Sequence, residues 1–161
     1  MKNSTSRRLA LLAMLAIAMI VVPAVTSLPA GIAGVKDSGC NCHGTEADTS
    51  VTASITGLPE TYNASEIYAV TVSFSGGPST DGNMNLGGFN LWASDGTFST
   101  VDDSTQLWGP AEASHTESGN DQRSWTVDWT APESGANVDF ILHVNSVNGN
   151  EGNGGSSGDM W

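Results

Sequence analysis

From Ser50 onward, apolar and polar residues alternate with a period of two in several short segments. Successive side chains of a β-strand point to opposite faces, so this alternation predicts half-buried strands rather than helices. Clusters of Gly, Pro, Asn and Ser separate the segments and are typical of turns. The five clearest predicted strands lie at residues 51–55, 68–74, 89–93, 125–129 and 138–144.

Short strands joined by turn-rich connections favour two packed antiparallel sheets. We therefore predict an all-β fold, an immunoglobulin-like antiparallel β-sandwich, with a small closed barrel as the alternative. Trp125, Val127 and Trp129 share one face of their strand and are expected in the core. The polar segments 75–88 and 101–122 are predicted to be long loops, which in compact domains commonly bind ligands.

The N-terminal residues have the pattern of a secretory signal peptide. Lys2, Arg7 and Arg8 precede an unbroken apolar run of 14 residues at 9–22, and small residues follow it. The run is too short for a bilayer core, which needs about 20 residues, although an uncleaved anchor is the alternative. Export to the cell surface or the extracellular space is the expected location.

Cleavage after Ser27 fits the small residues there, with Ala30 and Gly34 as other candidate ends. The predicted organisation is a signal peptide at 1–27, its end extending to 34 at most, a cysteine-containing leader at 28–49 and a β-sandwich domain at 50–161. The mature chain, about 125 residues, suffices for one hydrophobic core.

Removal of the signal peptide leaves two basic residues against 17 acidic ones, a net charge of −15. A negative field of this size repels nucleic acid and anionic lipid headgroups, so we expect neither as a partner. It suits a surface protein in salt water, where ions screen most of the self-repulsion over about 10 Å. The extracellular partner stays unknown from the sequence.

The strongest chemical signal is the cluster Cys40-Asn41-Cys42-His43. The only two cysteines are one residue apart, so no long-range disulfide can staple the fold. Cys40 and Cys42 offer thiolates and His43 an imidazole, which are ligands for soft or borderline metals.

Three interpretations of the cluster stay open. Covalent attachment of haem c normally uses C-x-x-C-H, and here one spacer residue is missing. A zinc or copper ion would take its remaining ligand from elsewhere, with His115 or Asp37 as candidates. A local disulfide between Cys40 and Cys42 needs a tight turn, because residues two apart in an extended chain lie about 6.6 to 7.2 Å apart.

Other candidates are weaker. His115 lies in a predicted loop and is the second candidate ligand for whatever His43 binds, whereas His143 is expected to be a surface or cross-strand residue. The segment 81–92 lacks the glycine and glutamate of an EF-hand calcium loop. The sequence shows no Ser-His-Asp order, phosphate-binding glycine loop or paired-carboxylate signature, and we expect a protein that is not an enzyme.

Several separated pieces of the chain resemble, in their order, one family of surface proteins. The pieces are 38–44 (SGCNCHG), 57–59 (GLP) with Tyr62 and Tyr68, 87–91 (GGFNL), His115, 125–132 (WTVDWTAP), 148–150 (NGN) and 158–159 (GD). The set resembles the choice-of-anchor V domain family, which is similar to the reelin-type N-terminal domain. The resemblance implies an exported β-sandwich held at the cell surface by a C-terminal anchor. No stop-transfer helix follows Trp161, so we expect either a missing anchor or a released protein.

The sequence therefore predicts an exported, non-enzymatic surface module. Its cofactor-binding residues are expected to be Cys40, Cys42, His43 and His115, the first three also serving for a metal. Haem c, zinc or copper is the expected cofactor, with electron transfer as the role of haem. The alternative is an adhesive or structural surface domain in which the cysteines only form a local disulfide. Contact with a membrane is expected only through a missing C-terminal anchor.

Overall fold

The computed structural model describes residues 29–40, 43, 46–80, 84–135, 137–149 and 158–161. The predicted signal peptide at 1–27 and Cys42 lie outside the described residues. The described strands, in chain order, are β1 (Val51–Thr56), β2 (Ile67–Gly76), β3 (Gly87–Ala93), β4 (Thr97–Thr100), β5 (Thr105–Leu107), β6 (Glu112–His115), β7 (Ser124–Thr130) and β8 (Phe140–Ser146). Within the same residues, no helix is long and apolar enough to cross a membrane.

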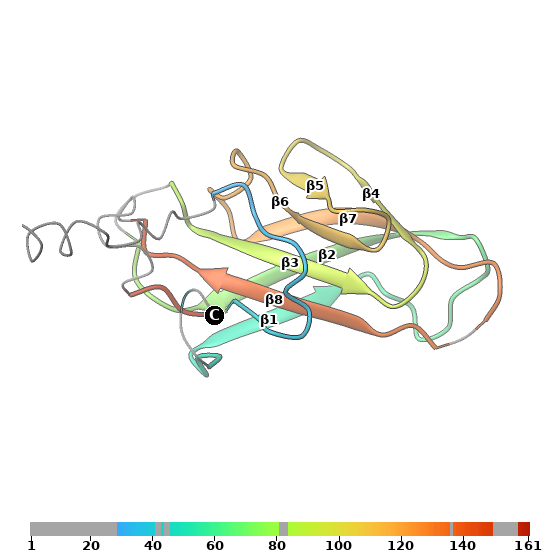
Figure 1. The fold of residues 1–161 in the computed structure, drawn as a ribbon, viewed down its shortest axis with the longest axis horizontal. Helices are drawn as coiled ribbons and strands as arrows, with labels where there is room; N and C mark the ends of the chain where they lie inside the picture. The colour runs from blue at the N-terminus through green and yellow to red at the C-terminus, as the bar shows by residue number, and fades with distance from the viewer. Residues whose placement is uncertain (1–28, 41–42, 44–45, 81–83, 136, 150–157) are drawn as a thin grey trace, which may run out of the picture.

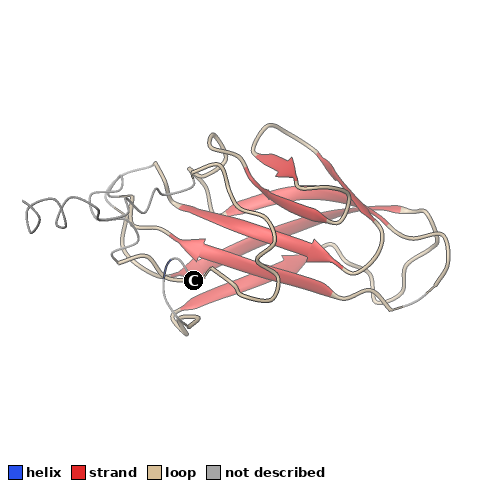
Figure 2. Ribbon diagram, in the orientation of Figure 1, coloured by secondary structure: helices blue, strands red, loops and turns tan. Residues whose placement is uncertain are grey.

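The strands form two four-stranded sheets with the orders β1-β2-β7-β4 and β5-β6-β3-β8. All paired neighbours are antiparallel. Figures 1 and 2 show the two sheets as crossing layers of strands. The predicted all-β sandwich is confirmed, and two separate sheets replace the closed barrel considered as the alternative.

The core lies between the sheets and is built from the alternating positions. Val70 on β2 is opposite Val127 on β7, and Val72 is opposite Trp125, so apolar side chains from neighbouring strands share the inner face. Trp125 and Trp129 are only 2% and 1% exposed, which confirms their predicted burial. The indole N–H of Trp125 donates to the Gly119 carbonyl at 2.7 Å, so the large ring is buried with its polar group satisfied.

The segment 101–122 is not one long loop, and that prediction was wrong. It contains β5 and β6, which pair with each other and, through β6, with β3. Both strands are short, and neither has an alternation long enough to be recognised in the sequence. Ala113 of β6 belongs to the core, and Ser114 is buried because a further segment covers the outer face of this sheet.

That segment is the described part of the leader, residues 29–40, drawn in blue in Figure 1 across β3 and β8. The Ile32 carbonyl accepts a hydrogen bond from the Asn90 amide at 2.8 Å, and the Gly34 N–H donates to Glu112 Oε1 at 2.7 Å. The Lys36 ammonium lies 4.7 Å from the Trp92 ring centroid. The described part of the leader is therefore a strap that lies across the sandwich.

Candidate functional site

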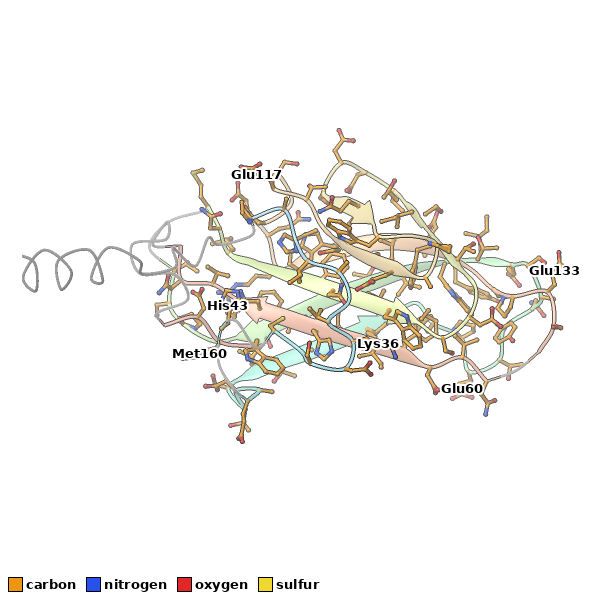
Figure 3. All side chains as sticks on the ribbon, viewed as in Figure 1. Lys36, His43, Glu60, Glu117, Glu133 and Met160 are labelled. Carbon is orange, nitrogen blue, oxygen red and sulfur yellow. The ribbon has the colours of Figure 1, made fainter. Side chains whose placement is uncertain are left out.

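His43 lies where the leader meets the C-terminal residues, at the same end of the sandwich as Met160 (Figure 3). Its backbone N–H donates to the Cys40 carbonyl at 2.8 Å, so His43 lies next to Cys40 in space. Nδ1 of the ring lies 3.2 Å from Asp159 Oδ2, and Nε2 lies 3.2 Å from the side-chain nitrogen of Asn145 at the end of β8. Three segments distant in sequence thus converge on this imidazole.

The contacts select a tautomer for His43. A carboxylate only accepts hydrogen bonds, so the proton lies on Nδ1 and faces Asp159. Nε2 then carries the lone pair of the ring and uses it to accept from the Asn145 amide. The Asp159 side chain is 6% exposed and also accepts from the Asn148 N–H, which fixes the carboxylate. An imidazole oriented by a buried carboxylate is the arrangement commonly seen for metal-binding histidines.

Asn145 contributes a buried polar atom to this site. The residue is 9% exposed, and its Oδ1 has no hydrogen-bond partner among the described residues. A buried amide oxygen without a partner costs free energy unless a donor or a cation satisfies it. This oxygen and His43 Nε2 belong to side chains in direct contact.

Only some of the predicted ligand residues lie close together in the structure. Cys40 and His43 lie next to each other, whereas Cys42 lies outside the described residues. Asp37 pairs with Lys36 at 3.4 Å on the surface, and its side chain is 81% exposed. Within the described part of the chain, no group of three or more His, Cys, Asp and Glu side chains is arranged to hold a metal ion.

His115 ends strand β6 and does not lie in a loop as predicted. Its ring packs against Phe89 and Trp125, with centroid distances of 6.4 and 6.2 Å. The Phe89 N–H donates to Nδ1 at 3.1 Å, so Nδ1 uses its lone pair and the ring proton lies on Nε2. Burial lowers the pKa of His115, an effect partly offset by its contact with the Phe89 backbone.

The position of His115 explains a glycine in β3. A Cβ at Gly88 would overlap the His115 ring, so only glycine leaves room for it. Gly88 is opposite Asn145 in the sheet, and Asn145 contacts His43. His115 is thus linked to the His43 site through these two residues, while its lone pair is already engaged. The arrangement favours packing as the role of His115, and its role as a ligand stays a prediction.

His143 lies opposite Asn90 on β3, as expected for a cross-strand residue. Its Nε2 lies 3.1 Å from the Lys36 carbonyl, and its ring is 6.2 Å from that of Trp161. His143 therefore takes part in fixing the leader and the C-terminal residues to β8. Sequence reasoning missed Asn145 and Asp159 as neighbours of His43, because neither has a local pattern that distinguishes it from other polar residues.

The fold defines an all-β antiparallel sandwich domain with its leader bound across one sheet. No family model matches the chain, and no curated protein is significantly similar to it. Among solved structures, it is similar to the human F-spondin reeler domain, with 25% identity over 63% of this chain and 78% of that one, at a TM-score of 0.42. The Reelin-N domain of F-spondin has 28% identity over 63% and 75%, also at 0.42. Because both TM-scores are 0.42, these similarities support no conclusion about function.

Proposed function

We propose that this protein is an exported, non-enzymatic surface module whose Cys40–His43 cluster binds one transition-metal ion, zinc or copper. The observation that carries the proposal is the orientation of His43, whose Nδ1 faces the buried Asp159 carboxylate and whose Nε2 lone pair an ion would take over from the Asn145 amide. Cys40, Cys42 and His43 would hold the ion, which would act as a Lewis acid or, if copper, as a redox centre. Asn145 Oδ1 supplies a fourth candidate ligand.

The geometry favours a small ion over haem. An axial haem ligand needs its nitrogen to face a slot wide enough for a porphyrin. Here Nε2 lies 3.2 Å from the Asn145 amide nitrogen, and the His43 side chain is only 26% exposed. Haem c at this position would require Nε2 to leave the Asn145 amide and the surrounding chain to make room for a porphyrin. Electron transfer, which zinc cannot perform, then depends on copper.

The leader contacts support removal of the signal peptide at the earlier candidate position. The carbonyls of Pro29 and Ala30 accept hydrogen bonds from Asn120 and Gln106, and Gly34 is bonded to Glu112. Cleavage after Gly34 would remove these contacts, whereas cleavage after Ser27 keeps them. N-terminal sequencing of the exported protein should therefore begin at Leu28, and a start at Val35 would contradict this expectation.

Metal analysis of protein exported with its own signal peptide tests the site. We expect close to one zinc or copper ion per chain and no haem absorption. His43→Ala should abolish the bound metal without unfolding the sandwich, and Cys40→Ser and Cys42→Ser should each weaken it, because thiolates and neutral imidazole are the ligands. His143→Ala is the matched control, a histidine on β8 that contacts the leader but is not a proposed ligand.

A second function is favoured by one specific observation. The hydrogen bond from His43 N–H to the Cys40 carbonyl holds these two residues close together, and a Cys40–Cys42 disulfide requires a tight turn at this place in the chain. In that case the cluster is structural and the protein is an adhesive surface domain. Exported protein without stoichiometric metal and with an oxidised Cys40–Cys42 pair would contradict the metal site and support this second function.

A further inference from the structure

At the end of the sandwich opposite His43, two loops enclose a hollow of about 560 Å³. One loop joins β1 to β2, and the other joins β7 to β8. The volume is within the range of natural small-molecule sites, about 300 to 1,000 Å³. The lining includes Glu60, Thr61, Tyr62, Trp129, Asn137 and Phe140.

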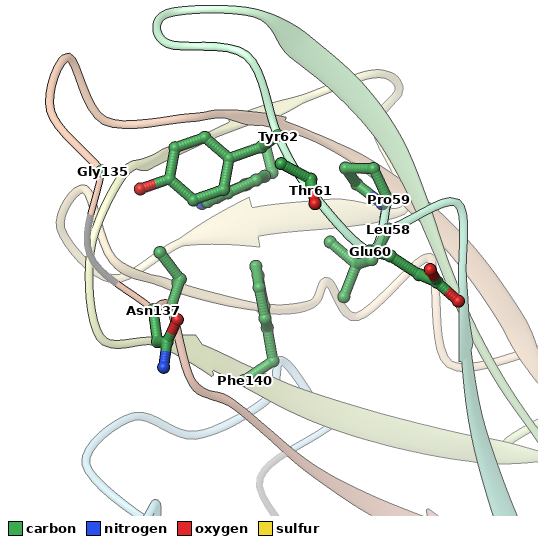
Figure 4. Close-up of a pocket in the computed structure, with 10 residues that line it drawn as sticks. Leu58, Pro59, Glu60, Thr61, Tyr62, Gly135, Asn137 and Phe140 are labelled. Atoms are coloured by element: carbon green, nitrogen blue, oxygen red, sulfur yellow. The ribbon is translucent and has the colours of Figure 1, made fainter.

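Aromatic rings form the inner part of this hollow. Tyr62 and Phe140 each stand nearly perpendicular to Trp129, at interplanar angles of 88° and 76°. Trp129 is almost fully buried, whereas Tyr62 and Phe140 keep part of their surface exposed. Figure 4 shows these two rings bordering one opening. A ligand in the hollow would therefore contact ring carbon atoms from both loops.

The rim of the hollow is polar. Glu60, Thr61 and Asn137 are exposed and offer a carboxylate, a hydroxyl and an amide, which together both donate and accept hydrogen bonds. The Glu60 carboxylate points away from the rings in Figure 4. Among the lining residues, the Glu60 carboxylate therefore lies apart from the aromatic surface.

Hydrogen bonds anchor the two loops close to the lining residues. The Asn63 N–H donates to the Tyr68 hydroxyl at 2.8 Å, which fixes the chain next to Tyr62. On the other wall, the Asp139 N–H donates to the Ser94 hydroxyl at 2.9 Å. The Ser65 N–H lies 3.4 Å from the Pro132 carbonyl and joins the two loops. A site with walls fixed in this way loses little conformational entropy on binding.

From these features we propose that the hollow binds a neutral saccharide. A sugar ring has apolar C–H faces and a perimeter of hydroxyl groups, which match an aromatic floor and a rim of amide, hydroxyl and carboxylate groups. The net charge of −15 on the mature chain disfavours sulfated or otherwise anionic glycans. The proposal is independent of the metal site, which lies at the other end of the sandwich.

Saturation-transfer NMR and calorimetry with neutral trisaccharides of glucose, mannose and N-acetylglucosamine test it. We expect at least one of them to bind. Tyr62→Leu and Phe140→Leu should each weaken binding about three- to tenfold, and Asn137→Ala, an exposed change that spares the fold, should weaken it by a similar factor. Trp108→Ala, at an aromatic residue that is 46% exposed and outside the hollow, is the matched control and should leave the affinity unchanged.

His43→Ala should also leave saccharide binding unchanged. A failure of the metal-site proposal can therefore be distinguished from a failure of the saccharide proposal. The absence of binding by every saccharide at about 10 mM, a very weak affinity, would overturn the proposal. So would binding that the Tyr62, Phe140 and Asn137 variants leave unchanged. Binding of choline but of no saccharide would instead assign the hollow to a cation and would equally overturn it.

Discussion

The side chain of His115 bonds to β3 at the residue just beyond the last backbone pair between β3 and β6. Residues 90–92 of β3 pair with β6, and beyond them the Phe89 N–H bonds to the His115 side chain instead of to a strand. The imidazole thus continues the hydrogen bonding of the sheet by one residue. Because the ring is buried and packed against Trp125, the neutral form is favoured in the folded protein.

The lowered pKa of His115 makes stability depend on pH. Below the unfolded value of about 6.5, the unfolded chain binds a proton that the folded chain does not, so the free energy of unfolding should fall as the pH falls. One such group contributes at most about 1.4 kcal/mol per pH unit. His115→Asn keeps a hydrogen-bond acceptor but does not titrate, and should flatten the dependence in denaturant titrations between about pH 5 and 8. Equal slopes in the two proteins would contradict this role.

Trp129 is the single side chain on which we expect the core to depend most. It is 1% exposed and contacts the rings of Phe140, Tyr62 and Tyr68. Trp129→Ala should lower the free energy of unfolding by about 3 to 5 kcal/mol, because it leaves a large cavity. Trp108→Ala, at an exposed position, should change it by less than about 0.5 kcal/mol. Chemical denaturation measures both, and a similar small loss for the two would show that Trp129 is not a core residue.

At the scale of elements, the leader buries the outer face of the sheet that it covers. Six of the seven residues of β3 are buried, although the strand alternates between inner and outer faces. Asn90, on the outer face, is 1% exposed because its amide bonds both to the Ile32 carbonyl and to Glu112. The outer face is thus sealed by backbone contacts of the leader and by polar side chains.

Two glycines in the leader test this strap. Gly31 and Gly34 both have positive φ, 77° and 74°, so alanine at either should cost about 1 to 2 kcal/mol of backbone strain. A Cβ at Gly31 would also overlap the Ser114 side chain, whereas a Cβ at Gly34 meets nothing within 4 Å. Gly31→Ala should therefore lose at least about 1 kcal/mol more than Gly34→Ala.

Denaturant unfolding compares the two variants, and hydrogen exchange at the Gly34 amide, which is bonded to Glu112, reports detachment of the leader. We expect faster exchange of the Gly34 amide in Gly31→Ala than in the unmodified chain. Equal losses of stability in the two variants, with unchanged exchange, would mean that the leader contributes nothing by packing on β6.

For the whole molecule, the charge of −15 on the mature chain sets the response to salt. Raising NaCl from about 0.01 M to about 0.15 M shortens the Debye length from about 30 Å to about 8 Å. Repulsion between distant carboxylates then weakens in the compact state more than in the expanded unfolded chain. The free energy of unfolding should rise by on the order of 1 kcal/mol. Thermal unfolding at the two salt concentrations measures it, and a decrease would contradict the argument.

A strand could be predicted from the sequence only where its alternation of apolar and polar residues was long enough. β2 and β7 have several alternating apolar residues each, and their burial in the core was predicted correctly. β5 and β6 have three and four residues, too few for a period of two to be distinguished from a loop. The second histidine of the predicted site was therefore assigned to a loop, although it ends a strand.

The sequence by itself determined the all-β class, the inner faces of the long strands and the tight spacing of Cys40, Cys42 and His43, because these depend on local periodicity and adjacency. Only the tertiary structure decided what surrounds His43. Asp159 and Asn145 are 116 and 102 residues away in sequence and reach the ring through the fold of β8 and the C-terminal residues. The leader likewise has no periodic pattern. It is held by single hydrogen bonds to side chains and backbone groups, and these contacts could not be predicted from the local sequence.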